Sequence, residues 1–201
     1  MTIVISGVSR DSAFAGALGS LLTGSFASRL FERDATLWGE AAAAEAAVRL
    51  GWTDFAAAAE HVLAEAEQLA GEFAAAGVDR IVLCGMGGSS LAPLLIAPGL
   101  TVLDSTHPDA VRASLEGDLR RTAVVVSSKS GGTVETLSHL AAFEAAFLGA
   151  GIDAAARIVV VTDPGSQLEA SAKASGKRVF LADPTVGGRF SALTAFGIVP
   201  S

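Results

Sequence analysis

Beyond Gly77 the sequence alternates between short apolar runs and helical segments, and this alternation limits the possible folds most strongly. The apolar runs lack a regular polar–apolar alternation, as expected for strands that are covered on both faces. Alternating strands and helices build βαβ units and a parallel sheet with helices on both faces. We therefore expect a three-layer α/β/α sandwich with a five-stranded parallel sheet. The expected strands are residues 81–84, 100–103, 123–127, 157–162 and 178–181, and the helical segments between them are residues 91–97, 109–119, 133–148 and 167–175.

The composition narrows the class of protein. The chain has 201 residues, of which 51% are hydrophobic and 17% charged, and this excludes a disordered chain. The net charge of −7 argues against nucleic acid and anionic membranes as partners. The single cysteine, Cys84, excludes a disulfide framework and is expected to be a buried apolar residue. Residues 81–103 are uncharged, but their glycines and prolines predict a strand, a loop and a short helix rather than a membrane span, so we expect a cytoplasmic protein.

The N-terminal part of the chain has a different pattern. Residues 3–8 form a short apolar run that suits a strand, and weakly helical segments follow it. Between residues 55 and 73 apolar side chains recur at helical spacing, and Gly77 suits a helix stop. We therefore expect a helical N-terminal lead, residues 1–54, and an α/β domain, residues 55–201.

In parallel sheets, ligands bind at the carboxyl ends of the strands, where the strand order reverses. If the order is 2-1-3-4-5, as in flavodoxin-like sheets, the loops after the first and third strands lie side by side at that point. The loop after the first strand contains Gly85, Gly87, Gly88, Ser89 and Ser90. Its glycines allow a tight turn, and its serines stand at a helix start, which suits an anion or a hydroxylated ligand. The same composition is also common in purely structural strand-to-helix turns.

The loop after the third strand gives the clearest indication of an anion site. Ser128, Lys129, Ser130 and Thr133 gather there with two glycines, at the start of the longest helix of the domain. Hydroxyls and glycines at a helix N-terminus predict a phosphate cradle. Each hydrogen bond to a charged oxygen contributes about 1.5–3 kcal/mol, so three or four suffice to hold a phosphate on an acidic chain. The alternative is a well-capped helix with Lys129 in solvent.

A third loop, residues 183–191, follows the fifth strand. Gly187 and Gly188 precede Arg189 and indicate a tight turn that presents a guanidinium to an anionic ligand or a developing oxyanion. An arginine in a surface ion pair would leave the same pattern. Residues 190–200 are apolar, and we expect them either to fold back onto the sheet or to mediate association.

Together the three loops resemble three blocks of the glucose-6-phosphate isomerase family, in the family's order. The blocks are residues 85–93, 128–136 and 186–196, and the third, which begins Val-Gly-Gly-Arg-Phe-Ser, is the most specific. The resemblance covers residues 55–201 and extends to the short bacterial isomerases and to the isomerase half of fused transaldolase–isomerase proteins. It implies the sugar isomerase (SIS) fold, which regulators and amidotransferases also use.

The resemblance implies a reaction as well as a fold. The family interconverts glucose 6-phosphate and fructose 6-phosphate by ring opening and proton transfer between C1 and C2, without a metal or other cofactor, in glycolysis and gluconeogenesis. In that reaction Arg189 would stabilise the cis-enediolate and Glu135 would order the rim of the site. The implied site residues are, for substrate binding, Gly88, Ser89, Ser128, Lys129, Ser130, Thr133 and Gly188 and, for catalysis, Arg189 and Glu135.

Three groups of the family's site have no match in this sequence: a glutamate base from its second half, a ring-opening histidine from a partner subunit and a lysine from near its C-terminus. Because the chain ends at Ser201, soon after the third block, we expect the first half of a longer enzyme that is a homodimer when complete, and no activity from the chain alone. We expect His61, His107 and His139 to be surface or packing residues rather than replacements. The blocks do not separate glucose 6-phosphate from mannose 6-phosphate.

A second class of function uses the same fold, namely a stand-alone module that senses a sugar phosphate without catalysis. Such a sensor needs the phosphate cradle but no arginine beside an enediolate, so Arg189 favours the enzyme. A structural domain with an empty pocket is a third possibility, and the complete set of hydroxyls and lysine after the third strand argues against it.

Overall fold

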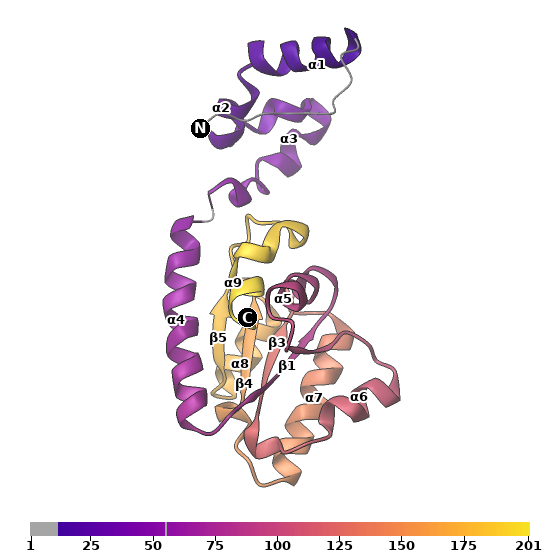
Figure 1. Ribbon diagram of the computed structural model, residues 1–201, viewed down its shortest axis with the longest axis vertical. Coiled ribbons are helices and arrows are strands. Elements are labelled where there is room, and N and C mark those ends of the chain that lie inside the picture. The colour runs from indigo at the N-terminus through magenta and orange to yellow at the C-terminus, as the bar shows by residue number, and fades with distance from the viewer. Residues whose placement is uncertain (1–11, 55) are drawn as a thin grey trace. The chain divides into compact units, whose positions relative to one another are not determined.

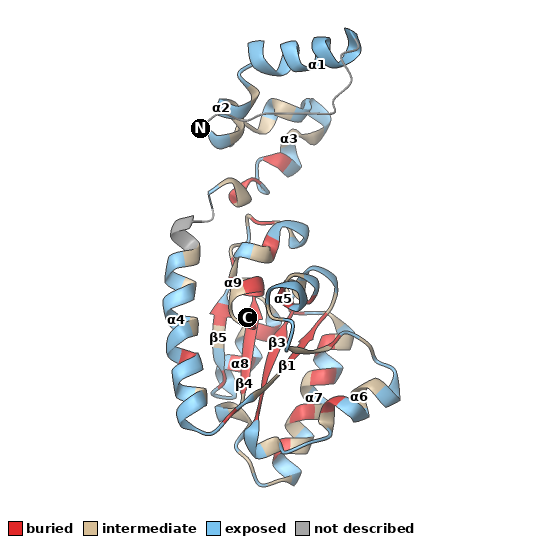
Figure 2. Ribbon diagram, in the orientation of Figure 1, coloured by how far each residue is buried: buried red, intermediate tan, exposed pale blue. Residues whose placement is uncertain are grey.

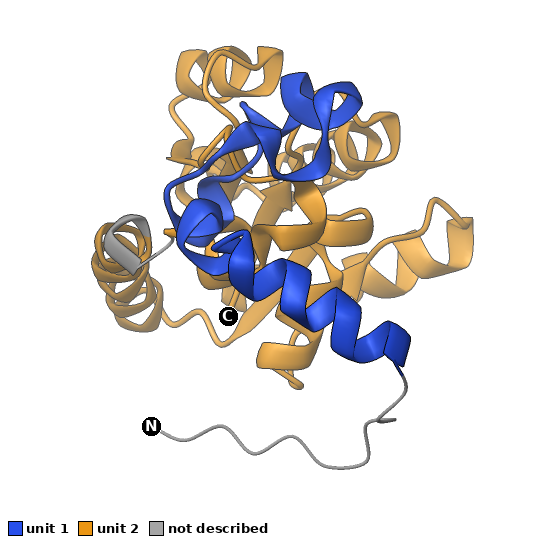
Figure 3. Cartoon of the chain, turned by 90° about the horizontal axis from the view of Figure 1, so that it is seen from above, with its two compact units in different colours: residues 1–53 blue, residues 54–201 orange. Residues whose placement is uncertain are grey.

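In the computed structural model the chain forms two compact units, residues 1–53 and residues 54–201 (Figure 3). The structure describes residues 12–54 and 56–201, so the apolar run at residues 3–8 lies outside the described residues. The first unit is helical, as expected of the N-terminal lead. Its elements are α1 (Ser12–Thr23), α2 (Phe26–Phe31) and α3 (Glu40–Ala46), with short 3-10 turns at Ala35–Trp38 and Gly51–Thr53.

Local contacts organise the first unit. The carboxylate of Asp34 accepts hydrogen bonds from the hydroxyl and N–H of Thr36 and from Arg29, and these bonds lower the pKa of Asp34 to about 2. Trp38 packs edge to face against Phe26, with ring centroids 6.1 Å apart. The edge-to-face arrangement is a favourable aromatic pair, so Trp38 acts here as a packing residue.

The second unit is a three-layer α/β/α sandwich, which confirms the expected fold class (Figure 1). Its five parallel strands follow the order β2-β1-β3-β4-β5, so the strand order reverses between β1 and β3. In the register of these two strands Gly85 lies beside Ser127, and their carboxyl ends are therefore level. The strands are β1 (Arg80–Gly85), β2 (Thr101–Leu103), β3 (Thr122–Ser127), β4 (Ile158–Thr162) and β5 (Arg178–Leu181).

Helices cover both faces of the sheet (Figure 1). Helices α4 (Ala56–Ala75) and α9 (Ala195–Ile198) pack on one face, and α6 (Pro108–Leu115), α7 (Val134–Gly149) and α8 (Gln167–Ala174) pack on the other; the short α5 (Leu91–Ile96) follows β1. Gly77, just beyond α4, has a φ of +75°, which confirms the predicted helix stop. Helix α6 ends four residues earlier than the sequence predicts, because Glu116 is extended and Gly117 has a φ of +104°.

The central strands are buried from end to end, as Figure 2 shows. Alternate residues of each strand point to opposite faces and supply two cores: Val124 and Val126 pack with Phe143 and Phe147, whereas Val125 packs with Phe196. Burial of each such aromatic ring contributes about 1.5–3 kcal/mol. These two cores fix the strand ends and the loops that leave them.

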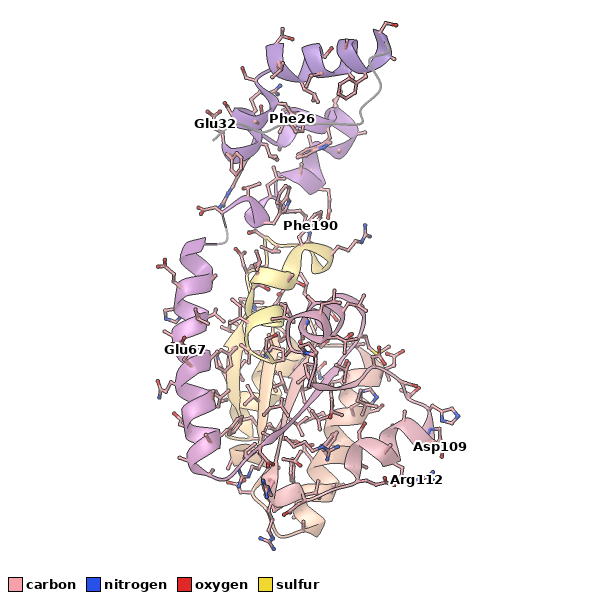
Figure 4. All side chains as sticks on the ribbon, in the orientation of Figure 1. Phe26, Glu32, Glu67, Asp109, Arg112 and Phe190 are labelled. Atoms are coloured by element: carbon pink, nitrogen blue, oxygen red, sulfur yellow. The ribbon has the colours of Figure 1, made fainter. Side chains whose placement is uncertain are left out.

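Part of the C-terminal segment of the second unit folds back onto the sheet, which was the first of the two expectations for residues 190–200. Ala195 and Phe196, at the start of α9, are buried in the core on one face of the sheet. Phe190, labelled in Figure 4, and Leu193 remain exposed. Cys84 is fully buried as expected, and burial raises the pKa of its thiol to about 12.

The described part of the chain contains neither a membrane-spanning helix nor a cluster of metal-binding side chains. None of the helices in residues 12–54 and 56–201 combines the length and the apolar character needed to cross a lipid bilayer. Within the same residues, no three histidine, cysteine or acidic side chains gather closely enough to hold a metal ion.

Candidate functional site

Three loops meet at the carboxyl edge of the sheet, where the strand order reverses. The first is residues 86–90 after β1, the second is residues 128–133 after β3, and the third is residues 183–193 after β5. We call them the first, second and third loops. Their convergence follows from the parallel sheet, because the loops that follow parallel strands all begin at the same edge of the sheet.

The first and third loops are in main-chain contact. A Cβ atom placed on Gly88 would lie 2.4 Å from the carbonyl oxygen of Gly188, a distance that no real side chain tolerates. The hydroxyl of Ser191 donates to the carbonyl of Gly188 at 2.6 Å and lies 3.5 Å from that of Gly88. Gly88 is therefore needed for close approach, and it brings two loops that are 100 residues apart in sequence together.

The second loop leaves the start of α7 without a side-chain cap. Thr133 occupies the N-cap position, where a hydroxyl ordinarily accepts a hydrogen bond from an N–H of the first turn. Instead its Oγ1 accepts a hydrogen bond from the hydroxyl of Ser128 at 3.0 Å, and the Thr133 side chain makes no capping bond. The N-terminal end of a helix attracts anions through its free N–H groups and its dipole. The two hydroxyls and the helix end thus form an arrangement that suits a phosphate.

Glycine and the loop after β4 fix the shape of the second loop. Gly131 has a φ of +68°, and a Cβ there would lie 2.7 Å from the Cβ of Ser166. The N–H of Gly131 donates to the carbonyl of Ser128 at 3.2 Å, and the hydroxyl of Ser130 accepts from the N–H of Gly132 at 3.3 Å. Ser130 itself is exposed at the rim.

Lys129 is not a free cation beside the hydroxyls. Its ammonium group lies 2.5 Å from a carboxylate oxygen of Asp163 and 3.5 Å from the carbonyl oxygen of Asp183. Both partners follow neighbouring strands, β4 and β5, so Lys129 joins three loops of the carboxyl edge. The sequence indicated the cation but not this pairing.

The two residues expected to act in catalysis occupy different loops. Arg189 is exposed in the third loop, and no carboxylate within the described residues pairs with its guanidinium. Its main-chain nitrogen would lie 3.7 Å from a Cβ on Gly88, so the main chain of Arg189 lies close to the first loop. Glu135 is half-buried in the first turn of α7, and its negative charge acts on His139 one turn later.

The histidines stand apart from the three loops. His61 on α4 is exposed, and His107 caps the start of α6, where its Nδ1 accepts from the N–H of Asp109 at 3.2 Å. His139 is buried, and its Nε2 lies 3.0 Å from the carbonyl oxygen of Ser105. Burial lowers the pKa of His139, although the Ser105 carbonyl and the charges of Glu135 and Asp104 oppose the shift.

Asp163 is the residue of this edge that sequence reasoning did not single out. The available signal was its position directly after the fourth predicted strand, which a parallel sheet places at the ligand edge. Nothing in the local sequence shows that it pairs with Lys129, because the two are separated by 34 residues.

The chain is similar in sequence and in fold to known proteins. No protein-family model matches the chain. It is 40% identical over 135 residues to the glucose-6-phosphate isomerase of Synechococcus sp. (strain JA-3-3Ab), and 37% identical over 133 residues to a probable glucose-6-phosphate isomerase of Haloarcula marismortui. These matches cover 61% and 62% of this chain but 25% and 30% of the relatives. The chain thus spans about a quarter of the length of the curated relatives it matches.

Solved structures show the same likeness. A hypothetical protein from Thermus thermophilus matches with a TM-score of 0.73 and 33% identity, over 93% of this chain and 45% of its own. A glucose-6-phosphate isomerase from Chlamydia trachomatis matches with a TM-score of 0.62 and 29% identity, over 85% of this chain and 33% of its own. The resemblance of the chain to glucose-6-phosphate isomerases is therefore confirmed in sequence and in fold.

Proposed function

We propose that the chain is the sugar-phosphate-binding domain of a glucose-6-phosphate isomerase. The observation that carries the proposal is the uncapped start of α7 at the second loop, where Ser128 and Thr133 face one another at the edge shared with the two other loops. Free N–H groups and two hydroxyls at one helix end suit a phosphate dianion. The relatives named as isomerases support the choice of a phosphorylated hexose.

In this proposal the phosphate replaces the internal hydrogen bond of the second loop. Ser128 and Thr133 exchange their mutual bond for bonds to phosphate oxygens, and N–H groups of the first turn of α7 add further donors. The hexose then extends toward Gly88, Ser89 and Gly188, where the first and third loops touch. Arg189 stabilises the negative charge that develops as the proton moves between C1 and C2, by electrostatic stabilisation of a cis-enediolate.

The same proposal assigns the proton transfers to groups outside this chain. General acid–base catalysis needs a group within hydrogen-bond reach of the transferred proton. In the described loops Asp163 is paired with Lys129, and the carboxylate of Asp183 accepts the N–H and hydroxyl of Thr185 at 2.7 and 2.6 Å. Glu135 orders the rim of the site, and with these carboxylates engaged we expect no isomerisation by the chain alone.

Calorimetric titration with glucose 6-phosphate tests the binding site. The Ser128→Ala/Thr133→Ala variant loses two hydrogen bonds to a charged group, each worth about 1.5–3 kcal/mol, so its affinity should fall by about 100-fold or more. The matched control is Ser20→Ala/Thr23→Ala, which removes two hydroxyls that bond only to carbonyls of their own helix α1. An affinity that the first variant leaves unchanged would refute the site.

A second titration separates the enzyme from a sensor. Enzymes bind the transition state more tightly than the substrate, so loss of a group that acts on the enediolate weakens an enediolate mimic most. Arg189→Lys should therefore weaken binding of a phosphorylated hydroxamate, a planar mimic of the enediolate, by a larger factor than binding of glucose 6-phosphate. Equal losses for both ligands would favour the sensing module.

A further inference from the structure

The second loop is supported from one side by the loop that follows β4. The N–H of Asp163 donates to the carbonyl of Lys129 at 3.2 Å, while the ammonium of Lys129 donates to the carboxylate of Asp163 at 2.5 Å. The two residues therefore bind each other in both directions, through main chain and side chain. The N–H of Ser128 also donates to the carbonyl of Val161 in β4 at 3.0 Å.

This pair is shielded from solvent. The side chains of Lys129 and Asp163 are only 22% and 19% exposed. Partial burial weakens solvent screening, so the attraction between the charges exceeds that of a surface pair. The contact of Lys129 with the Asp183 carbonyl extends the link to the loop after β5.

We propose that Asp163 is a positioning residue of the phosphate site. Its ion pair with Lys129, which we call the clasp, links the loops after β3, β4 and β5. The clasp keeps the second loop in the shape that leaves the start of α7 open to an anion. Lys129 then serves binding through the loop's shape and not through its charge, which Asp163 neutralises. This inference rests on the proposed function, because the anion is the phosphate of the hexose.

The two roles of Lys129 predict opposite effects of one substitution. If Lys129 binds the phosphate directly, Asp163→Asn frees its charge and removes a nearby negative charge, so the affinity for glucose 6-phosphate rises. If Lys129 acts through the clasp, Asp163→Asn loosens the second loop and the affinity falls despite the more favourable net charge. We expect a fall of about 10-fold, which corresponds to about 1.4 kcal/mol.

The experiment is a titration of the 201-residue chain with glucose 6-phosphate, using Asp163→Asn, Lys129→Met and the double variant. Each single variant should lose about 10-fold, and the double variant should lose no more, because both singles break one interaction. Asp163→Glu, which keeps the carboxylate, should restore part of the loss. The charge controls are Asp79→Asn and Arg112→Met, which break the exposed pairs Asp79–Arg121 and Arg112–Asp109.

The salt dependence of binding separates a direct phosphate ligand from a positioning residue. A direct phosphate ligand makes binding more sensitive to ionic strength, and its removal lowers that sensitivity. We expect the slope of log Kd against log salt to be the same in Lys129→Met and in the unmodified chain. A higher affinity in Asp163→Asn, additive losses in the double variant or a reduced slope in Lys129→Met would each overturn the clasp.

Hydrogen exchange keeps the two proposals distinguishable. An unmodified chain that does not bind glucose 6-phosphate would refute the proposed function. The clasp is still tested in that chain, because Asp163→Asn should speed exchange at the N–H groups of Ser128 and Gly131, which donate within and beside the second loop. Unchanged exchange at these two amides, with the charge controls also unchanged, would overturn the clasp on its own.

Discussion

The contact between the first and third loops predicts that Gly88→Ala is costly. The added Cβ would lie 2.4 Å from the carbonyl oxygen and 3.0 Å from the carbonyl carbon of Gly188, and both are main-chain atoms that no rotamer change can move. The loops would have to separate by about 1 Å to reach ordinary van der Waals contact. Overpacking of this kind costs about 1–3 kcal/mol.

The expected change in thermal stability follows from this cost. For a chain of 150–250 residues each kcal/mol shifts the melting temperature by about 2–4 °C, so a cost of about 2 kcal/mol lowers it by about 4–8 °C. Far-ultraviolet circular dichroism is the suitable assay. Tryptophan fluorescence is not, because Trp38 and Trp52 both lie in the first unit and the contact lies in the second.

The matched control is Gly188→Ala, on the other side of the same contact. A Cβ on Gly188 meets no described atom within 4 Å, and its backbone conformation is one that alanine adopts. This variant should keep the melting temperature or raise it slightly, because alanine restricts the unfolded chain. Equal melting temperatures for Gly88→Ala and Gly188→Ala would show that the two loops do not make this contact.

Three further predictions concern other parts of the second unit. A coupled assay of the purified chain should give an isomerase turnover below about 1 s⁻¹, the low end of the usual enzyme range, and a higher value would place a base within the chain. Native Cys84 should resist iodoacetamide at pH 8 and react once the chain is unfolded, because burial raises its pKa to about 12; rapid labelling of the native chain would contradict this burial. Since burial lowers the pKa of His139, the folded state holds its proton more weakly than the unfolded state, and the free energy of unfolding should fall as the pH drops below 6.5. Denaturant titrations between pH 5 and pH 8 should show this fall, and His139→Gln should flatten it; the same slope in both proteins would assign it to other groups.

The strands were predictable because burial on both faces requires short runs of apolar residues, which are visible in the local sequence. Each predicted strand overlaps an observed one, and residues 178–181 coincide with β5. The order of the strands is not visible in the local sequence, because it depends on how each crossover packs. The predicted end of a helix was wrong where the conformation of a glycine determines it. The segment predicted to be helical to residue 119 ends earlier, because Gly117 has a positive φ.

The residues of the candidate site differ in how far the sequence indicates their neighbours. Ser128 and Thr133 belong to one loop at a helix start, and the structure brings their hydroxyl oxygens to 3.0 Å from one another. Lys129 was interpreted as a cation beside a phosphate, whereas its ion pair with Asp163 depends on how two separate loops pack. The approach of Gly88 to Gly188 joins positions 100 residues apart, so only the folded chain reveals it.

The pairing of Lys129 limits which groups could attract the proposed phosphate to an acidic chain. The net charge of −7 repels a phosphate at long range, and the lysine of the second loop is neutralised by Asp163. In the proposed function, attraction of the phosphate to the start of α7 would then come from main-chain N–H groups and the helix dipole, which act within the first turn and are fixed in direction. Such donors favour a ligand with several oxygens at tetrahedral positions over one that is merely negative. No described carboxylate pairs with the exposed guanidinium of Arg189, so in the proposed function its charge would be available where negative charge develops on the hexose.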